Sequence, residues 1–179
     1  EDGGIRPDST LEALSKLQTA FLEGGTVTAG NASTINDGAA FVVLVSNAFL
    51  KQYKFSTALR VSAQQSSGCD PAIMGVGPVD CVSLLLKRAK LDINAIDLFE
   101  INEAFSSQSL AIQRELAIPN EKLNVNGGAI SLGHPIGASG TRIIVTLYHE
   151  MKKRAVQRGI ASLCIGGGQA NALLVEMNT

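Results

Sequence analysis

Continuous apolar stretches alternate along this chain with stretches in which apolar residues recur every three or four positions. The first pattern is typical of buried strands, and the second is typical of helices that bury one face. Their alternation predicts an α/β layered fold with a mixed, mostly parallel sheet. The last two predicted strands are closely connected, so we expect them to run antiparallel to each other.

The expected elements follow from these patterns and from the residues that punctuate them. A five-stranded sheet is predicted from residues 39–45, 57–64, 97–101, 159–165 and 172–177. Helices are predicted at residues 11–21, at a short segment capped by Ser46, and at residues 79–89, 104–116 and 141–157. Ligands of such folds bind where loops leave the carboxyl ends of strands, which here are residues 102–104, 124–139 and 164–168.

Composition narrows the possible partners. Apolar residues make up 45% of the chain and charged residues 17%, with a net charge of −1, so there is no basic field to attract nucleic acid or an anionic membrane. The apolar runs are far shorter than the roughly 18 residues that suggest a membrane span. Cys69, Cys81 and Cys164 are widely spaced and form no zinc-type pair, so we expect reduced thiols, a cytoplasmic location and no metal.

Residues 124–141 contain five glycines and His134, which indicates a backbone shaped for close approach to another group. An ordered turn with a packed histidine fits equally well, whereas a phosphate-binding loop fits poorly because no Lys-Ser/Thr pair follows the glycines. Cys164 ends a predicted strand and precedes the glycines at residues 166–168, whose amides would favour negative charge near the sulfur. A buried, inert cysteine is the alternative. Asn102 lies where a strand meets a helix, and a helix N-cap is its alternative role.

Four segments taken together resemble the ordered signatures of thiolases. They are residues 30–39 (GNASTINDGA), 102–105 (NEAF), 124–140 (NVNGGAISLGHPIGASG) and 164–168 (CIGGG). The resemblance covers essentially the whole chain and is closest to acetyl-CoA acetyltransferases. It implies a thiolase-like fold, with residues 1–25 as the tail of the loop domain that covers CoA and residues 26–179 as the C-terminal domain.

The resemblance also implies a Claisen condensation of two acetyl-CoA to acetoacetyl-CoA and CoA through an acyl-enzyme. Cys164 matches the family's acid/base cysteine, His134 the histidine that donates to the thioester oxygen, and Asn102 the asparagine that holds a water with the same task. The amide of Gly166 matches one donor of the second oxyanion hole. The nucleophilic cysteine belongs to the N-terminal half, so this chain alone is expected to be inactive. It also opens without a methionine, which favours a processed or cut chain.

Weaker correspondences concern the substrate. Arg6 matches a contact to the nucleotide end of CoA, Ser33 the position facing the pantetheine arm, and Met74 and Phe105 positions lining the acyl pocket. Turn polarity for Ser33 and core packing for Met74 and Phe105 are the plain alternatives. The sequence departs from many relatives at Thr34 and at Gln169-Ala170, where glycine is common.

The resemblance makes CoA thioesters substrates and suggests no separate cofactor. The expected partners are the N-terminal thiolase half and further copies, in a homodimer or homotetramer of the full-length protein. Two other functions remain open from the sequence: a degradative 3-ketoacyl-CoA thiolase that acts on longer chains, and a thiolase-like lipid- or CoA-binding module without turnover.

Overall fold

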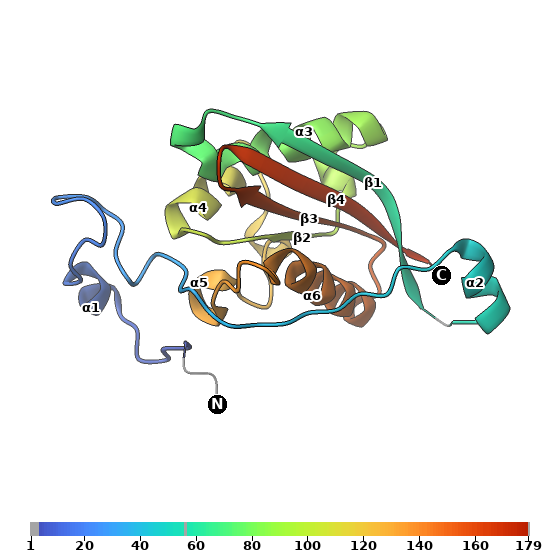
Figure 1. The fold of residues 1–179 in the computed structure, drawn as a ribbon, viewed down its shortest axis with the longest axis horizontal. Coiled ribbons are helices and arrows are strands. Elements are labelled where there is room, and N and C mark those ends of the chain that lie inside the picture. The colour runs from blue at the N-terminus through green and yellow to red at the C-terminus, as the bar shows by residue number, and fades with distance from the viewer. Residues whose placement is uncertain (1–3, 56, 179) are drawn as a thin grey trace.

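Figure 1 shows the fold in a computed structural model, which describes residues 4–55 and 57–178. The strands are β1 (Ala58–Gly68), β2 (Leu98–Ile101), β3 (Arg158–Ile165) and β4 (Gln169–Asn178). The longer helices are α3 (Gly77–Ala89), α4 (Ser106–Glu115) and α6 (Ser139–Arg154). The shorter ones are α1 (Leu11–Ser15), α2 (Asn47–Tyr53), α5 (Ala129–Leu132) and the 3-10 helices η1 (Pro71–Val76), η2 (Ile93–Ala95) and η3 (Asn120–Lys122).

The strands of the described residues form one sheet in the order β1, β4, β3, β2. β2 pairs with β3 in parallel, whereas β4 is antiparallel to both β1 and β3. The predicted antiparallel arrangement of the last two strands is therefore confirmed, because a turn of only three residues joins them. The predicted five-stranded, mostly parallel sheet is wrong: this sheet has four strands and is mostly antiparallel.

The missing fifth strand is the segment predicted at residues 39–45. These residues run outside the sheet and pair with no strand of the described chain. Phe41, Val43 and Leu44 are 87%, 86% and 81% exposed. An apolar run becomes a strand only where a neighbouring strand can bond to its backbone, and no described strand lies beside this one. We call residues 39–45 the apolar segment.

The helix predicted at residues 11–21 is also shorter than expected. α1 begins after Thr10, whose hydroxyl accepts a hydrogen bond from the Ala13 amide at 3.1 Å, and it ends at Ser15. None of its residues is buried, and a short helix is marginal without packing against an apolar face. The N-cap predicted at Ser46 is confirmed, since its hydroxyl accepts from the Phe49 amide at 3.2 Å at the start of α2.

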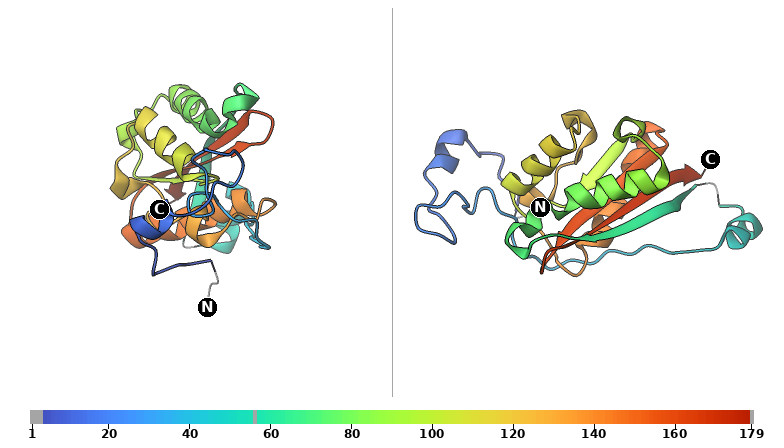
Figure 2. Two further views of the ribbon diagram at one scale, coloured as in Figure 1. Left: turned by 90° about the vertical axis from the view of Figure 1, so that its left-hand side faces the viewer. Right: turned by 90° about the horizontal axis from the view of Figure 1, so that it is seen from above.

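Helices cover both faces of the sheet. α3 and α4 lie on one side and α6 on the other, while α1 and α2 lie beyond opposite ends of these layers (Figures 1 and 2). The strand pleat explains the division, because alternate residues of a strand point to opposite faces. Phe99 and Ile101 belong to the core beneath α3, whereas Leu98, the residue before Phe99, belongs to the core beneath α6.

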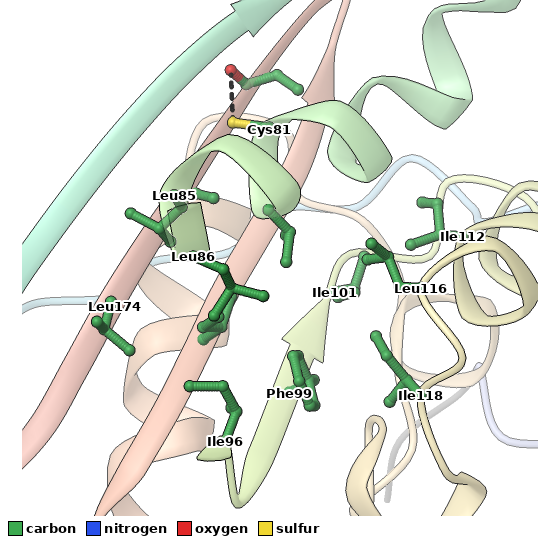
Figure 3. Packing of buried hydrophobic residues seen from close by; sticks show 14 residues of the cluster. Cys81, Leu85, Leu86, Ile96, Phe99, Ile101, Ile112, Leu116, Ile118 and Leu174 are labelled. Atoms are coloured by element: carbon green, nitrogen blue, oxygen red, sulfur yellow. Dashed lines mark hydrogen bonds between the residues drawn. The ribbon is translucent and has the colours of Figure 1, made fainter. Parts of the chain in front are cut away.

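The two main helices were predicted from their apolar spacing, and both are confirmed. α3 buries Cys81, Val82 and Leu85 against the sheet, and the Cys81 sulfur lies 3.5 Å from the carbonyl oxygen of Ala170 in β4 (Figure 3). α6 buries Ile143, Leu147 and Met151 at intervals of four residues on the opposite face. Among the described residues, no helix is both long enough and apolar enough to cross a membrane.

The turn between β3 and β4 offers a test of the fold. Gly167 and Gly168 both have φ +86°, but a Cβ on Gly168 would lie 2.3 Å from the Cys69 carbonyl oxygen, whereas one on Gly167 would meet nothing within 4 Å. Gly167→Ala should cost about 1 kcal/mol from backbone strain alone. Gly168→Ala should cost at least about 3 kcal/mol, because strain and the clash add. Urea denaturation of both variants checks this, and equal costs would contradict it.

Candidate functional site

Asn102 leaves the carboxyl end of β2 and is almost fully buried, at 1% exposure. Its backbone amide donates to the Ser162 carbonyl at 3.0 Å, which extends the pairing of β2 with β3 by one residue. Its side-chain nitrogen lies 3.4 Å from Nε2 of His134. Its Oδ1 atom is buried and has no hydrogen-bond partner among the described residues, so it can accept from a bound molecule or water.

The helix N-cap role that composition allowed for Asn102 is wrong. α4 begins at Ser106, and Phe105 is its N-cap residue. The Gln108 side chain organises this turn instead, because its Oε1 accepts from the Ala104 amide at 3.0 Å. Asn102 therefore has its side chain free for another purpose.

His134 is held by contacts on two sides. Its backbone amide donates to the Thr34 carbonyl at 2.9 Å, and its Nδ1 lies 2.6 Å from the Ser139 hydroxyl. Gly133 before it has φ +95°, and a Cβ there would lie 2.3 Å from Asn36 Oδ1. The glycine thus permits the close approach of residues 34–36 that fixes the histidine backbone.

Ser139 is a site residue that sequence reasoning missed. It is the first residue of α6, is fully buried, and its hydroxyl also lies 3.1 Å from the Pro135 carbonyl. Because the one proton of this hydroxyl is donated to the Pro135 carbonyl, the Ser139 oxygen accepts from Nδ1–H of His134. Nε2 then carries no proton and accepts from the Asn102 side-chain nitrogen. The signal in the sequence is a small hydroxyl residue placed at the start of a helix directly after the histidine turn.

The charge state of His134 follows from its surroundings. Burial, and then the positive charge of Arg142, lowers the pKa of His134. Both effects disfavour the imidazolium, so the ring is neutral at neutral pH. A neutral ring carries its proton on either nitrogen, and its hydrogen-bond partners decide which one.

Cys164 lies at the end of β3 and pairs with Ala170 of β4. Burial is the main cause of a raised pKa for its thiol, and the neighbouring Cys69 raises the pKa further, while a backbone hydrogen bond opposes both. Burial thus opposes the negative charge that the amides of the glycine turn were expected to favour on this sulfur. The protonated thiol is the stable form.

The other predicted positions are distributed around this edge of the sheet. β2 and β3 are parallel, so Asn102 and Cys164 leave the sheet at the same edge, although no hydrogen bond between described residues joins them. Gly166 is exposed, and its amide makes no backbone hydrogen bond to the described residues. A Cβ on Gly166 would meet nothing within 4 Å, so the space beside its Cα is open.

The predicted substrate contacts divide into two groups. Ser33 lies beside the site, because its amide donates to the Ala104 carbonyl at 3.0 Å and Ala32 bridges to Phe105. The Phe105 ring packs edge-on against Phe21, with 6.3 Å between centroids. Phe105 belongs to neither apolar core cluster, which weakens the plain core-packing alternative.

The positions of Met74 and Arg6 say little about their predicted contacts to the substrate. Met74 is half-buried in η1 and, like Phe105, lies outside both core clusters. Arg6 is exposed near α1, and its side chain forms no ion pair with the described residues. Their roles toward a substrate stay predictions.

Comparison with known proteins identifies the family. Residues 55–177 match the thiolase C-terminal domain, and residues 1–48 match the thiolase N-terminal domain. This chain belongs to the thiolase family. It is 53% identical over 176 residues to a probable acetyl-CoA acyltransferase of Staphylococcus aureus (strain MRSA252), a match that covers 98% of this chain and 44% of that relative.

Solved thiolase structures agree with the fold. A crystal structure of the Bacillus anthracis acetyl-CoA acetyltransferase has a TM-score of 0.96 and 46% identity, covering 99% of this chain and 45% of that one. Human mitochondrial 3-ketoacyl-CoA thiolase has a TM-score of 0.91 and 45% identity over the same shares, and a further structure of it, with 43% identity and a TM-score of 0.90, is in complex with CoA. The chain thus spans less than half the length of these thiolases.

The Cys164 thiol provides a test of the site's electrostatics. The pH midpoint of its alkylation by iodoacetamide, followed by mass spectrometry of the Cys164 peptide, should be higher in the folded chain than in the same chain unfolded in urea. Burial disfavours the reactive thiolate only in the folded state. An equal or lower midpoint in the folded chain would mean that the amides of the glycine turn outweigh burial.

Proposed function

We propose that this chain is the C-terminal part of an acetyl-CoA C-acetyltransferase. The reaction is the reversible condensation of two acetyl-CoA to acetoacetyl-CoA and CoA, with the nucleophilic cysteine supplied by the N-terminal part of the same protein. The observation that carries the proposal is the pair of Asn102, which is buried, and His134, which is half-buried, 3.4 Å apart at the sheet edge where the Cys164 strand also ends. A base and two polar donors at one edge are what enolate formation requires.

In the condensation direction, the Cys164 thiolate removes a proton from the methyl group of acetyl-CoA. The negative charge moves to the thioester oxygen, where His134 Nε2–H and a water held by Asn102 donate hydrogen bonds. For the ring proton to sit on Nε2, the Ser139 hydroxyl turns from the Pro135 carbonyl to Nδ1 of His134 when substrate binds. The resulting carbon nucleophile attacks the acetyl group on the nucleophilic cysteine. A carbon–carbon bond forms and the carbon–sulfur bond to the enzyme breaks, so no oxidant or reductant is needed. Gly166 donates its amide to the oxyanion of this second step.

In the cleavage direction the same groups act in reverse. The Cys164 thiol, whose protonated form is favoured by burial, gives its proton to the departing acetyl-CoA enolate. A thiol with a raised pKa suits the acid role well. The same raised pKa means that forming the Cys164 thiolate, the base in the condensation direction, costs free energy.

The apolar segment supports the proposed partner. Three of its large side chains are more than four-fifths exposed, and contiguous exposed apolar residues mark surfaces that other protein covers. Its residues also fall within the match to the thiolase N-terminal domain. We propose that the N-terminal part of the protein covers them, and that the full-length protein assembles as a homodimer or homotetramer.

A degradative 3-ketoacyl-CoA thiolase is the second candidate. The identity to the human mitochondrial 3-ketoacyl-CoA thiolase, 45%, nearly equals the 46% to the Bacillus anthracis acetyltransferase. Structural similarity therefore does not separate the two substrate classes. A binding module without turnover is less favoured, because a purely binding fold has no need to bring Asn102 and His134 together at one edge with a thiol.

Kinetics of a protein containing both thiolase parts test the function. It should cleave acetoacetyl-CoA in preference to longer 3-ketoacyl-CoA substrates, and Cys164→Ala should lower kcat by at least about a hundredfold because acid–base catalysis is lost. Cys69→Ala is the matched control and should lower kcat far less than Cys164→Ala, because Cys69 only adds to the effect of burial on the pKa of Cys164. A strong preference for long chains would favour the second candidate, and unchanged activity of Cys164→Ala would refute the mechanism.

Ser139→Ala tests the hydroxyl that orients His134. Without it, the imidazole loses the partner that selects its Nε2–H form, and kcat should fall about tenfold with a smaller change in KM. Ser83→Ala is the matched control: its hydroxyl bonds the carbonyl four residues earlier, at 2.8 Å, as the Ser139 hydroxyl does at 3.1 Å, but it lies exposed on α3. Equal kcat values for the two variants would contradict the role of Ser139.

A further inference from the structure

Asn102 and His134 come from separate segments, so some contact must hold those two segments at a fixed distance from each other. The loop from residue 124 to residue 134 has few apolar anchors and is half-buried or exposed over much of its length. Its polar side chains are therefore the candidates for fixing it against β2. Two of them, Asn124 and Asn126, make specific contacts to neighbouring elements.

The Asn124 side chain makes the two backbone hydrogen bonds to Ile101 that a neighbouring strand would otherwise make. Its Oδ1 accepts from the Ile101 amide at 2.8 Å, and its Nδ2 donates to the Ile101 carbonyl at 2.8 Å. Asn124 has φ +45°, a left-handed conformation that asparagine and aspartate tolerate better than most residues. The amide and the carbonyl of Ile101, the residue before Asn102, are thus both hydrogen-bonded to the Asn124 side chain.

Glu103 holds the residue after Asn102. One carboxylate oxygen accepts from Asn124 Nδ2 at 3.0 Å, and the other accepts from the Ile130 amide at 3.1 Å, in the first turn of α5. A Cβ on Gly128 would lie 2.3 Å from the carboxyl carbon, so the glycine leaves the space that the carboxylate fills. α5 then leads through Gly133 directly to His134.

We propose that Asn124 and Glu103 form a clamp that sets the distance between Asn102 and His134. Asn124 fixes the backbone on one side of Asn102, and Glu103 ties the other side to the helical turn that precedes His134. Both are positioning residues, since neither reaches the reacting atoms through its own side chain. The inference rests on the proposed function, because the clamp matters for turnover only if Asn102 and His134 stabilise the enolate together.

The test uses E103Q, N124D and the double variant in the protein that contains both thiolase parts. In E103Q, an NH2 group replaces one of the two carboxylate oxygens. It must then face a donor, either Asn124 Nδ2 or the Ile130 amide, and because it cannot accept a hydrogen bond, one of the two contacts is lost. In N124D the donor to Ile101 and Glu103 is lost while the backbone conformation stays accessible. Each single variant should lower kcat about tenfold or more while KM changes less, because small misplacements of donors are costly.

The double variant distinguishes a clamp from two independent effects. The amide introduced by E103Q can donate to the carboxylate introduced by N124D and still accept from Ile130, which restores the contact between positions 103 and 124. The kcat of the double variant should therefore exceed that of N124D, whereas independent effects would multiply. A double variant whose loss equals the product of the single losses would overturn the clamp.

N126D is the matched control. Asn126 lies in the same loop and makes a similar contact, its Nδ2 donating to Glu150 Oε2 at 3.0 Å, but it touches neither Asn102 nor its flanking residues. N126D should leave kcat within about twofold of the wild type. Equal losses for N124D and N126D would mean that the loop needs only general stability, which would overturn the clamp.

A second measurement does not depend on turnover. The pKa of the His134 ring, followed by NMR of labelled histidine and assigned with a His134 substitution, should rise in E103Q and N124D and not in N126D, because a loosened ring regains contact with water. An unmoved His134 pKa in both clamp variants would overturn the clamp. If His134→Ala and Asn102→Ala kept full activity, the proposed function would fail while the His134 pKa would still report on the clamp.

Discussion

The parallel pairing of β2 with β3 is the constraint on which the rest of the structure depends. β2 has only four residues, and all are buried, since α3 and α4 cover one of its faces and α6 the other. Its pairing continues through the Asn102 amide to Ser162, so the position of Asn102 is fixed by the sheet rather than by a loop. Functional side chains placed on rigid elements keep their geometry better than those carried by loops alone.

Much of the layered core was predictable because its pattern is local. The spacing of apolar residues predicted α3 and α6, and the glycines at residues 166–168 predicted the turn before β4. The failures have a common physical cause. The apolar segment and the helix around α1 carry apolar faces, but whether such faces form strands or long helices depends on protein that packs against them. A local pattern contains no information about that partner, and the number of strands was wrong for the same reason.

The site shows a different limit of sequence reasoning. Cys164, His134 and Asn102 were singled out by their glycine-rich or strand-terminal surroundings, yet their roles came from the resemblance and not from the residues themselves. The contact of Asn102 with His134 joins residues 32 positions apart and depends on Asn124 folding back onto β2, which no periodicity reveals. Ser139 and Glu103 look like ordinary helix-start residues in the sequence. Only their hydrogen bonds distinguish them.

Burial also determines the charge of Glu100, which lies beside Arg142 beneath the site. Glu100 lies two residues before Asn102 along the chain and is 2% exposed. Burial raises the pKa of Glu100 to about 8, although Arg142, 3.6 Å away, acts in the opposite direction. At neutral pH the carboxyl is thus largely protonated and Arg142 keeps its charge. Burial lowers the pKa of His134, and the charge of Arg142 lowers it further and favours negative charge nearby. A neutral donor beside an unneutralised guanidinium is suited to a reaction that places a transient anion on an oxygen, and ionising Glu100 at higher pH would remove that advantage.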